Sequence, residues 1–155
     1  MGLTQAQKTT LKTDMHSGGN AAALGTWLAA ADWPSIATWY NTDSGSTVWR
    51  PSIPVSDLTR NIVGTVADGL STQKQQGYIM LTQGGFVDAT YASVRAWFSD
   101  IFGAGATLTA LTAEAQRPAT RFQMLFATAA SPANVTTVFG QMLTAEDVRL
   151  AELQG

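Results

Sequence analysis

The strongest helical signal lies in residues 88–103, Asp88-Ala89-Thr90-Tyr91-Ala92-Ser93-Val94-Arg95-Ala96-Trp97-Phe98-Ser99-Asp100-Ile101-Phe102-Gly103. Within this stretch Tyr91, Val94, Trp97, Phe98 and Ile101 recur at the three- and four-residue spacing that places side chains on one face of a helix. A wide apolar face of this kind packs either on a core or on a partner, and at this stage both interpretations remain open.

Capping residues and glycines mark where this helix and its neighbours begin and end. Asp88 or Thr90 is expected to begin the helix above, and Gly103 to end it. Working outward, we expect further helices from Thr4 to Ser17, from Asn20 to Ala31, from Asp32 to Tyr40, from Ser56 or Asp57 to Gly69, from Ser71 to Leu81, from Leu108 through the apolar face of Phe122, Leu125 and Phe126, and from Thr144 onward. The expected N-caps are Thr4, Asn20, Asp32, Ser71 and Thr144. The predicted fold class is mainly α, a compact bundle of about six to eight short helices.

Two parts of the chain lack a helical pattern. Residues 41–55 are expected to form a long irregular loop, in which residues 41–46 have turn chemistry and Pro51 and Pro54 favour an extended path. Residues 47–50 are compatible with a short extended piece, as is the β-branched segment near 135–143. Pro118 is expected to interrupt, kink or restart a helix. A structureless loop of about 15 residues inside a compact domain is unusual and often functional.

Length and residue types bound the function classes. The chain has 155 residues, so we predict one helical domain, residues 1–155, without room for a second of ordinary size. It contains no cysteine and one histidine. The missing cysteines exclude disulfide scaffolds, thiolate metal sites and cysteine nucleophiles, and the single histidine excludes a site built on two.

Charge is scarce. Charged residues make up 13% of the chain and the formal net charge is −2, against about 25% charged residues in an average protein. This balance favours neither a nucleic-acid nor an acidic-lipid partner. The chain also has five Trp, six Phe, three Tyr and five Met, residue types that are enriched in protein interfaces. The composition fits a small uncharged monomer with an aromatic core, but it favours a subunit of an assembly.

The N-terminal residues are not expected to act as a targeting signal. Lys8 and Lys12 precede the apolar run Ala21–Ala31, which outlines a signal peptide, but residues 13–20 separate the two and include Asp14. The run is also far shorter than the roughly 20 residues that span a bilayer. We therefore expect a protein made and kept in a cytoplasm, with no membrane partner.

No motif indicates an active site. His16 is expected at a helix C-terminus, where a positive charge is favourable, and no G-x-S-x-G pentapeptide accompanies it. Residues 103–107 begin like a dinucleotide-binding loop but lack its third glycine and follow a helix, so they predict a helix end. The eleven acidic residues are scattered. We predict that the protein is not an enzyme and has no catalytic, cofactor-binding or metal-binding residues.

Several segments together resemble a family of small, mostly uncharacterised structural proteins of tailed bacteriophages, encoded among the head and tail genes. The segments that carry the resemblance are Thr47-Val48-Trp49-Arg50-Pro51-Ser52-Ile53-Pro54-Val55, Val94-Arg95-Ala96-Trp97-Phe98-Ser99-Asp100-Ile101-Phe102-Gly103-Ala104-Gly105, Arg117, Ala119-Thr120-Arg121, Leu125-Phe126-Ala127-Thr128 and Val138-Phe139-Gly140. The resemblance implies a component of the virion, assembled in the bacterial cytoplasm. Its leading form is a ring-forming head-to-tail adaptor, or connector, that contacts portal and tail proteins.

Contact residues are expected where aromatic and rigid residues border irregular segments. The candidate interface residues are Trp39, Tyr40, Trp49, Arg50, Pro51, Ile53, Phe86 and Phe139. Ordinary core packing is the alternative for each of the aromatic residues.

Other functions remain open at this stage. Within the virion, the alternatives are a capsid cement or decoration protein and a tail-completion protein. Outside that class, they are a small phage-encoded hydrolase and a module that binds one host protein. A hydrolase needs acidic residues that converge in a cleft, and a host-binding module is distinguished by the bacterial protein that it binds.

Overall fold

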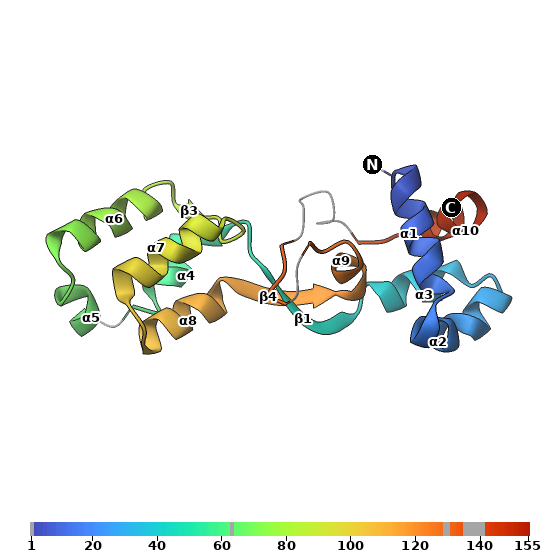
Figure 1. Ribbon diagram of the computed structural model, residues 1–155, viewed down its shortest axis with the longest axis horizontal. Coiled ribbons are helices and arrows are strands. Elements are labelled where there is room, and N and C mark those ends of the chain that lie inside the picture. Colours follow the sequence, from blue (N-terminus) through green and yellow to red (C-terminus); the bar gives the residue numbers. More distant parts are fainter. Residues whose placement is uncertain (1, 63, 129–130, 135–141) are drawn as a thin grey trace. The chain divides into compact units, whose positions relative to one another are not determined.

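The structure, a computed structural model, describes residues 2–62, 64–128, 131–134 and 142–155. In this part of the chain it has ten helices and four short strands (Figure 1). Seven of the helices have eight residues or more. The prediction of a mainly helical fold is therefore confirmed.

The chain divides into two compact units. The first unit comprises Met1–Ser46, Ala119–Thr128 and Val135–Gly155, and the second comprises Thr47–Pro118 and Ala129–Asn134. That the units belong to one domain stays a prediction.

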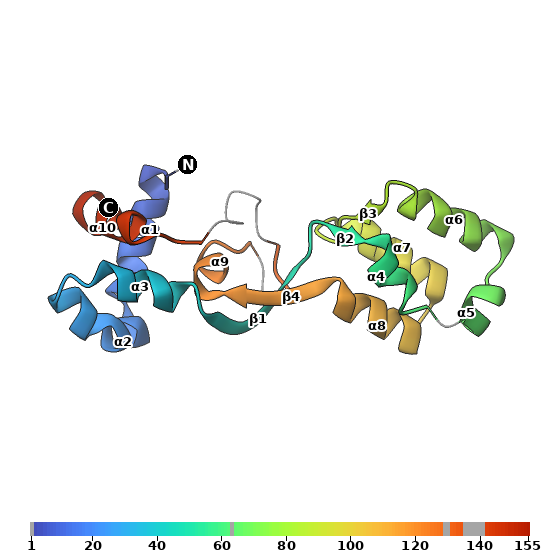
Figure 2. The ribbon, with the colours of Figure 1, turned by 180° about the vertical axis from the view of Figure 1, so that it is seen from behind.

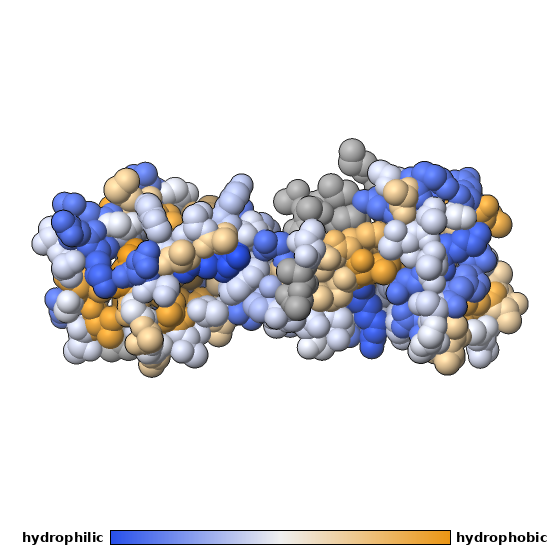
Figure 3. Space-filling view, viewed as in Figure 1, coloured by the Kyte–Doolittle hydropathy of each residue, from blue (hydrophilic) through white to orange (hydrophobic). Residues whose placement is uncertain are grey.

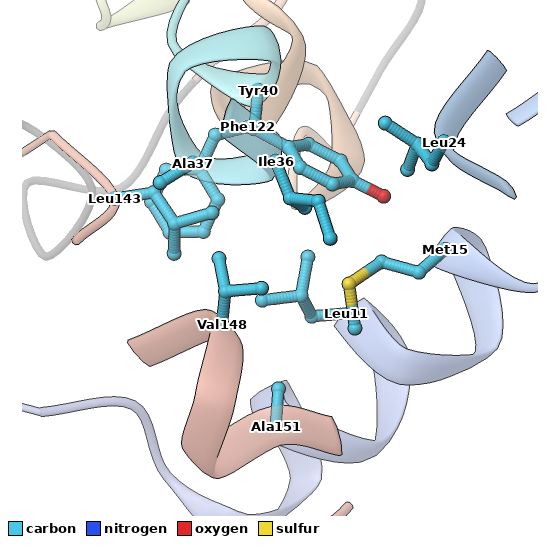
Figure 4. Packing of buried hydrophobic residues seen from close by; sticks show 10 residues of the cluster. All are labelled: Leu11, Met15, Leu24, Ile36, Ala37, Tyr40, Phe122, Leu143, Val148 and Ala151. Carbon is cyan, nitrogen blue, oxygen red and sulfur yellow. The ribbon is translucent and has the colours of Figure 1, made fainter. Parts of the chain in front are cut away.

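The first unit contains helices α1 (Gln5–Met15), α2 (Gly18–Ala29), α3 (Trp33–Tyr40), α9 (Arg121–Leu125) and α10 (Ala145–Gln154). The C-terminal helix α10 packs against α1 and α3. Figure 4 shows the buried cluster that these helices share, with the side chains of Leu11 and Val148 directed at each other between α1 and α10. Its members are Leu11, Met15, Leu24, Ile36, Ala37, Tyr40, Phe122, Leu143, Val148 and Ala151.

Side-chain caps fix the helix starts in this unit. Thr4 and Thr144 each form a capping box, in which the hydroxyl accepts from the third residue of the helix and that residue's side chain accepts from the backbone of the cap. Asp32 caps α3 by accepting from the backbone N–H of Ser35. All three predicted caps are confirmed. The prediction for α2 is wrong, because its N-cap is Ser17, and Asn20 lies inside the helix and donates to Asp14 instead.

The second unit contains α4 (Val55–Thr59), α5 (Gly64–Asp68), α6 (Thr72–Thr82), α7 (Ala92–Phe102) and α8 (Ala106–Glu114). Strand β2 (Ile53–Pro54) pairs antiparallel with β3 (Phe86–Val87), with Ile53 opposite Val87 and Pro54 opposite Phe86 (Figure 2). Its buried cluster is formed by Ile53, Leu58, Val87, Ala89, Phe98, Leu111 and Ala115.

The expectation of an irregular loop over residues 41–55 is wrong, because strand β1 (Asp43–Trp49) and strand β2 occupy most of it. The short extended piece expected at residues 47–50 overlaps the end of β1. Strand β1 pairs with β4 (Gln116–Thr120), which was not predicted. The division between the units falls inside both strands. In the part of β1 that belongs to the second unit, the backbone N–H of Trp49 donates to the carbonyl of Ala133 over 3.1 Å. These partners are distant in sequence, so no local pattern reveals them.

Several helix boundaries in the second unit also differ from the prediction. A single helix was expected up to Gly69, but α4 ends at Thr59 and α5 begins at Gly64, a residue that weakens a helix. Helix α7 begins at Ala92, because the carboxylate of Asp88 accepts from the backbone N–H of Thr90 in a turn just before it.

The cap expected for α4, Ser56 or Asp57, is also wrong, because α4 begins at Val55 with Pro54 as its N-cap. Two other ends in the second unit agree with the prediction. Ser71 caps α6, and Gly103 ends α7 with a φ of 65°, in the left-handed region that favours glycine. Pro118 lies in β4, between the end of α8 and the start of α9. The extended segment expected near 135–143 lies mostly outside the described residues.

Candidate functional site

Five large apolar side chains are exposed on three neighbouring elements of the second unit. Ile79 and Met80 lie on α6, Phe86 lies on β3, and Tyr91 and Trp97 lie at the N-cap and in the middle of α7. Trp97 is 42% exposed and the other four are 61–62% exposed. We call these five residues the α6–α7 surface. Figure 3 shows hydrophobic residues reaching the surface of this unit among hydrophilic ones.

The exposure of Ile79 and Met80 follows from the sequence of α6. Tyr78, Ile79, Met80 and Leu81 are four successive apolar residues, and in an α-helix four successive side chains spread around almost the whole circumference. Tyr78 and Leu81 are half-buried toward α7 and its neighbours, with the ring of Tyr78 edge-on to Phe102 at 5.7 Å. The two residues between them consequently face water, and α6 has no fully buried residue.

The apolar stripe of α7 divides in the same way. Phe98 and Ile101 are buried in the second unit, whereas Tyr91 and Trp97 are exposed. The sequence left open whether this stripe faces a core or a partner. The structure places one part of it in the core and leaves the other part unpartnered among the described residues.

A groove runs between α6 and α7 with Trp97 at its middle. At one end it forms a hollow of 310 Å³ lined by Gln73, Lys74, Gly77, Trp97, Asp100 and Ile101. At the other end it forms a hollow of 220 Å³ lined by Leu81, Ser93, Val94 and Trp97. The start of α6 thus faces the end of α7, and the two helices run antiparallel along the groove.

Two opposite charges flank the larger hollow. Lys74 lies in the first turn of α6 and Asp100 near the end of α7, and both are exposed. Neither side chain takes part in an ion pair within the described ranges, where the ion pairs join His16 to Glu152, Arg50 to Asp57 and Glu114, Arg60 to Asp57, and Arg149 to Glu146. The groove therefore combines an apolar centre with a cation and an anion that no other described residue neutralises.

Two of the predicted interface residues are buried. Tyr40 and Ile53 are core residues, exposed by 1% and 0%. Trp39 is half-buried in the first unit, where the guanidinium of Arg121 lies 4.6 Å from its ring centroid. Phe139 lies outside the described residues.

The remaining predicted residues belong to the second unit. Trp49 is half-buried beneath the guanidinium of Arg95, 4.6 Å from its ring centroid. Arg50 is half-buried and forms an ion pair with Glu114. Pro51 is exposed, and Phe86 is the one residue of the predicted set that belongs to the α6–α7 surface.

The prediction missed Ile79 and Met80. The signal in the sequence that could have identified them is the run of four apolar residues, 78–81, within a short helix.

Within the described residues, no three acidic or histidine side chains lie close enough together to hold a metal ion. His16 is the C-cap residue of α1, as predicted, and its Nε2 lies 2.9 Å from Glu152 Oε2 on α10. In the same part of the chain, no helix is both long and apolar enough to cross a bilayer.

Comparisons of the chain with models of protein families, with curated proteins and with solved structures found no match.

Proposed function

We propose that the chain is a non-enzymatic assembly protein of a bacteriophage particle, a ring-forming head-to-tail adaptor that bridges the portal and the tail. The observation that best supports a protein-binding function of this chain is the α6–α7 surface. Removing apolar area from water is favourable by about 25 cal/mol per Å². Five large apolar side chains gathered on one unit of a small protein therefore favour contact with another protein surface.

The scarcity of charge supports the same proposal. At 13% charged residues, the chain has little of the mixed surface charge that keeps small proteins apart. The resemblance of residues 47–55 and 94–105 to structural proteins of tailed phages directs the proposal to the virion. The partners are then further copies of the chain together with portal and tail proteins, and no cofactor is needed.

The mechanism is mechanical rather than chemical. Each copy buries apolar side chains against its neighbours, and many copies close a ring because the contacts repeat around an axis. Aromatic and methionine side chains suit this role, since they bury large areas and adapt to the partner surface. The ring is assembled in the bacterial cytoplasm and becomes part of the virion.

Electron microscopy of phage that lacks the gene tests this function. An adaptor is required to join heads to tails, so the deletion should give filled or emptied heads and free tails in separate populations. Supplying the wild-type gene in the host should restore joined particles, and supplying the Trp97→Ser variant should not. The control is Leu153→Ser, which removes an exposed apolar side chain (65% exposed) from α10 in the first unit. Joined, infectious particles without the gene contradict the proposal.

A further inference from the structure

We propose that the groove between α6 and α7 binds the same groove of a second copy of the chain, with Lys74 of each copy opposite Asp100 of the other. The inference rests on the proposed function in one respect, that the α6–α7 surface binds protein. It goes further by naming the partner and the contact.

The charges of the groove are self-complementary. Lys74 and Asp100 line the same hollow from opposite helices, and neither forms an ion pair within the described residues. A partner that fits this hollow has to present an anion to Lys74 and a cation to Asp100, on either side of an apolar centre. A second copy of the groove presents that arrangement when α6 of one copy lies against α7 of the other.

A twofold axis along the groove produces this contact. Rotation about this axis places α6 of one copy opposite α7 of the other, and each residue keeps its height along the groove. Lys74 of each copy therefore lies opposite Asp100 of the other, and both pairs form at once. Trp97 and Gly77 line the same hollow, so the axis also sets the bulky indole of each copy against the residue of the other copy that has no side chain. A large side chain on one surface that meets a glycine on the other allows two helical surfaces to approach closely.

Ile79 and Met80 are exposed on α6 but line neither hollow of the groove, so the pairing does not rest on them. Under the proposed function, this pair of copies is the unit of assembly, and a second contact elsewhere on the chain closes the ring.

Charge-reversal variants test the pairing. Both residues are exposed, so Lys74→Asp and Asp100→Lys should fold normally, which circular dichroism checks. Light scattering on a sizing column then measures mass against concentration for each variant alone and for an equimolar mixture. Each variant alone brings like charges together twice per pair, so its dissociation constant should rise at least about tenfold above that of the wild type.

The equimolar mixture should associate like the wild type. In a mixed pair, the aspartate introduced in one variant lies opposite the lysine introduced in the other. The unchanged Lys74 and the unchanged Asp100 lie opposite each other as well, so both charge pairs are restored with one of them reversed. A general loss of binding in either variant would not be repaired by mixing.

The control is Asp68→Lys, which makes the same charge change on an exposed residue at the end of α5, away from the groove; it should leave association unchanged. The pairing is overturned if the wild type stays at its monomer mass up to its solubility limit, if either reversal associates as the wild type does, or if the mixture does not recover. If any of these holds while the deletion phage still leaves heads and tails apart, the pairing fails and the proposed function stands.

Discussion

The hydroxyl of Tyr40 donates a hydrogen bond of 2.6 Å to Oδ2 of Asp14, joining α3 to α1 inside the first unit. The same oxygen accepts from Nδ2 of Asn20 over 2.9 Å. One carboxylate oxygen therefore links the first three helices. Because the Tyr40 side chain is buried in the apolar cluster (Figure 4), its hydroxyl depends on Asp14 to satisfy its donor.

Replacing Tyr40 with phenylalanine should destabilise the protein. The change removes a hydrogen bond to a carboxylate and leaves an acceptor with one partner fewer, a loss of about 1.5–3 kcal/mol in the free energy of unfolding. Denaturant unfolding followed by circular dichroism measures the loss. The matched control is Tyr78→Phe, whose hydroxyl lies 3.3 Å from the exposed Thr59 hydroxyl and contributes little. Equal stabilities for the two variants would show that the buried bond contributes nothing.

The same contact predicts a dependence on alkaline pH. Burial raises the pKa of Tyr40 far above its ordinary value of 10.0, and the hydrogen bond and negative charge of Asp14 raise it further. A raised pKa in the folded state favours the protonated form, so its contribution to stability is complete below pH 10.0 and is lost as the pH rises above that value. The free energy of unfolding should fall more steeply above pH 10 in the wild type than in Tyr40→Phe. Parallel slopes would contradict this account.

The capping box of α10 should be measurable on its own. Thr144 Oγ1 accepts from the backbone N–H of Asp147 over 3.1 Å and donates to Oδ2 of Asp147 over 2.6 Å. Thr144→Ala should cost about 1 kcal/mol of unfolding free energy. Ser17→Ala at the start of α2 is the control, because Ser17 makes no side-chain cap bond and should cost less. The shift in denaturant midpoint compares the two variants. A larger loss of unfolding free energy in Ser17→Ala than in Thr144→Ala would contradict the capping role of Thr144.

Two glycine substitutions should change stability in opposite directions. Gly77 lies inside α6, and a Cβ added there meets Ile101 Cδ1 at 3.8 Å, an ordinary contact distance. Gly77→Ala should therefore raise the unfolding free energy by roughly 0.5–1 kcal/mol. Gly45 has a φ of +76° in β1, so Gly45→Ala should lower it by about 1–2 kcal/mol. The melting temperatures of the two variants test this prediction. Shifts of the same sign in both variants would contradict the opposite effects expected from their backbone conformations.

Local signals in the sequence predicted the helices well. The helix starts at Gln5, Trp33, Thr72 and Ala145 follow from Thr4, Asp32, Ser71 and Thr144, because a cap acts over three residues and is readable from a short stretch. The strands β1 and β4 were not predictable in this way, except that residues 47–50 at the end of β1 were expected to be extended. Their pairing partners are distant in sequence, and Pro118 within β4 indicates a break in a helix rather than a strand.

The candidate site was only partly predictable, for a related reason. Phe86 was expected at a contact and is exposed, but Tyr40 and Ile53, chosen by the same argument, are buried. An aromatic or aliphatic residue at the edge of an irregular segment suits a core and an interface equally well. What identifies the α6–α7 surface is the crowding of apolar residues 78–81 on a helix that packs against α7 and β3 along one side, and this becomes clear once that packing is known.

The association of the purified protein tests the central claim, that the α6–α7 surface is a protein-binding surface, most directly. Light scattering across a concentration series should give the wild type a mass that rises above 16.4 kDa with concentration. The Trp97→Ser variant should associate more weakly than the wild type, and Leu153→Ser should behave as the wild type does. If Trp97→Ser folds and associates as strongly as the wild type, the surface between α6 and α7 is not where the chain assembles.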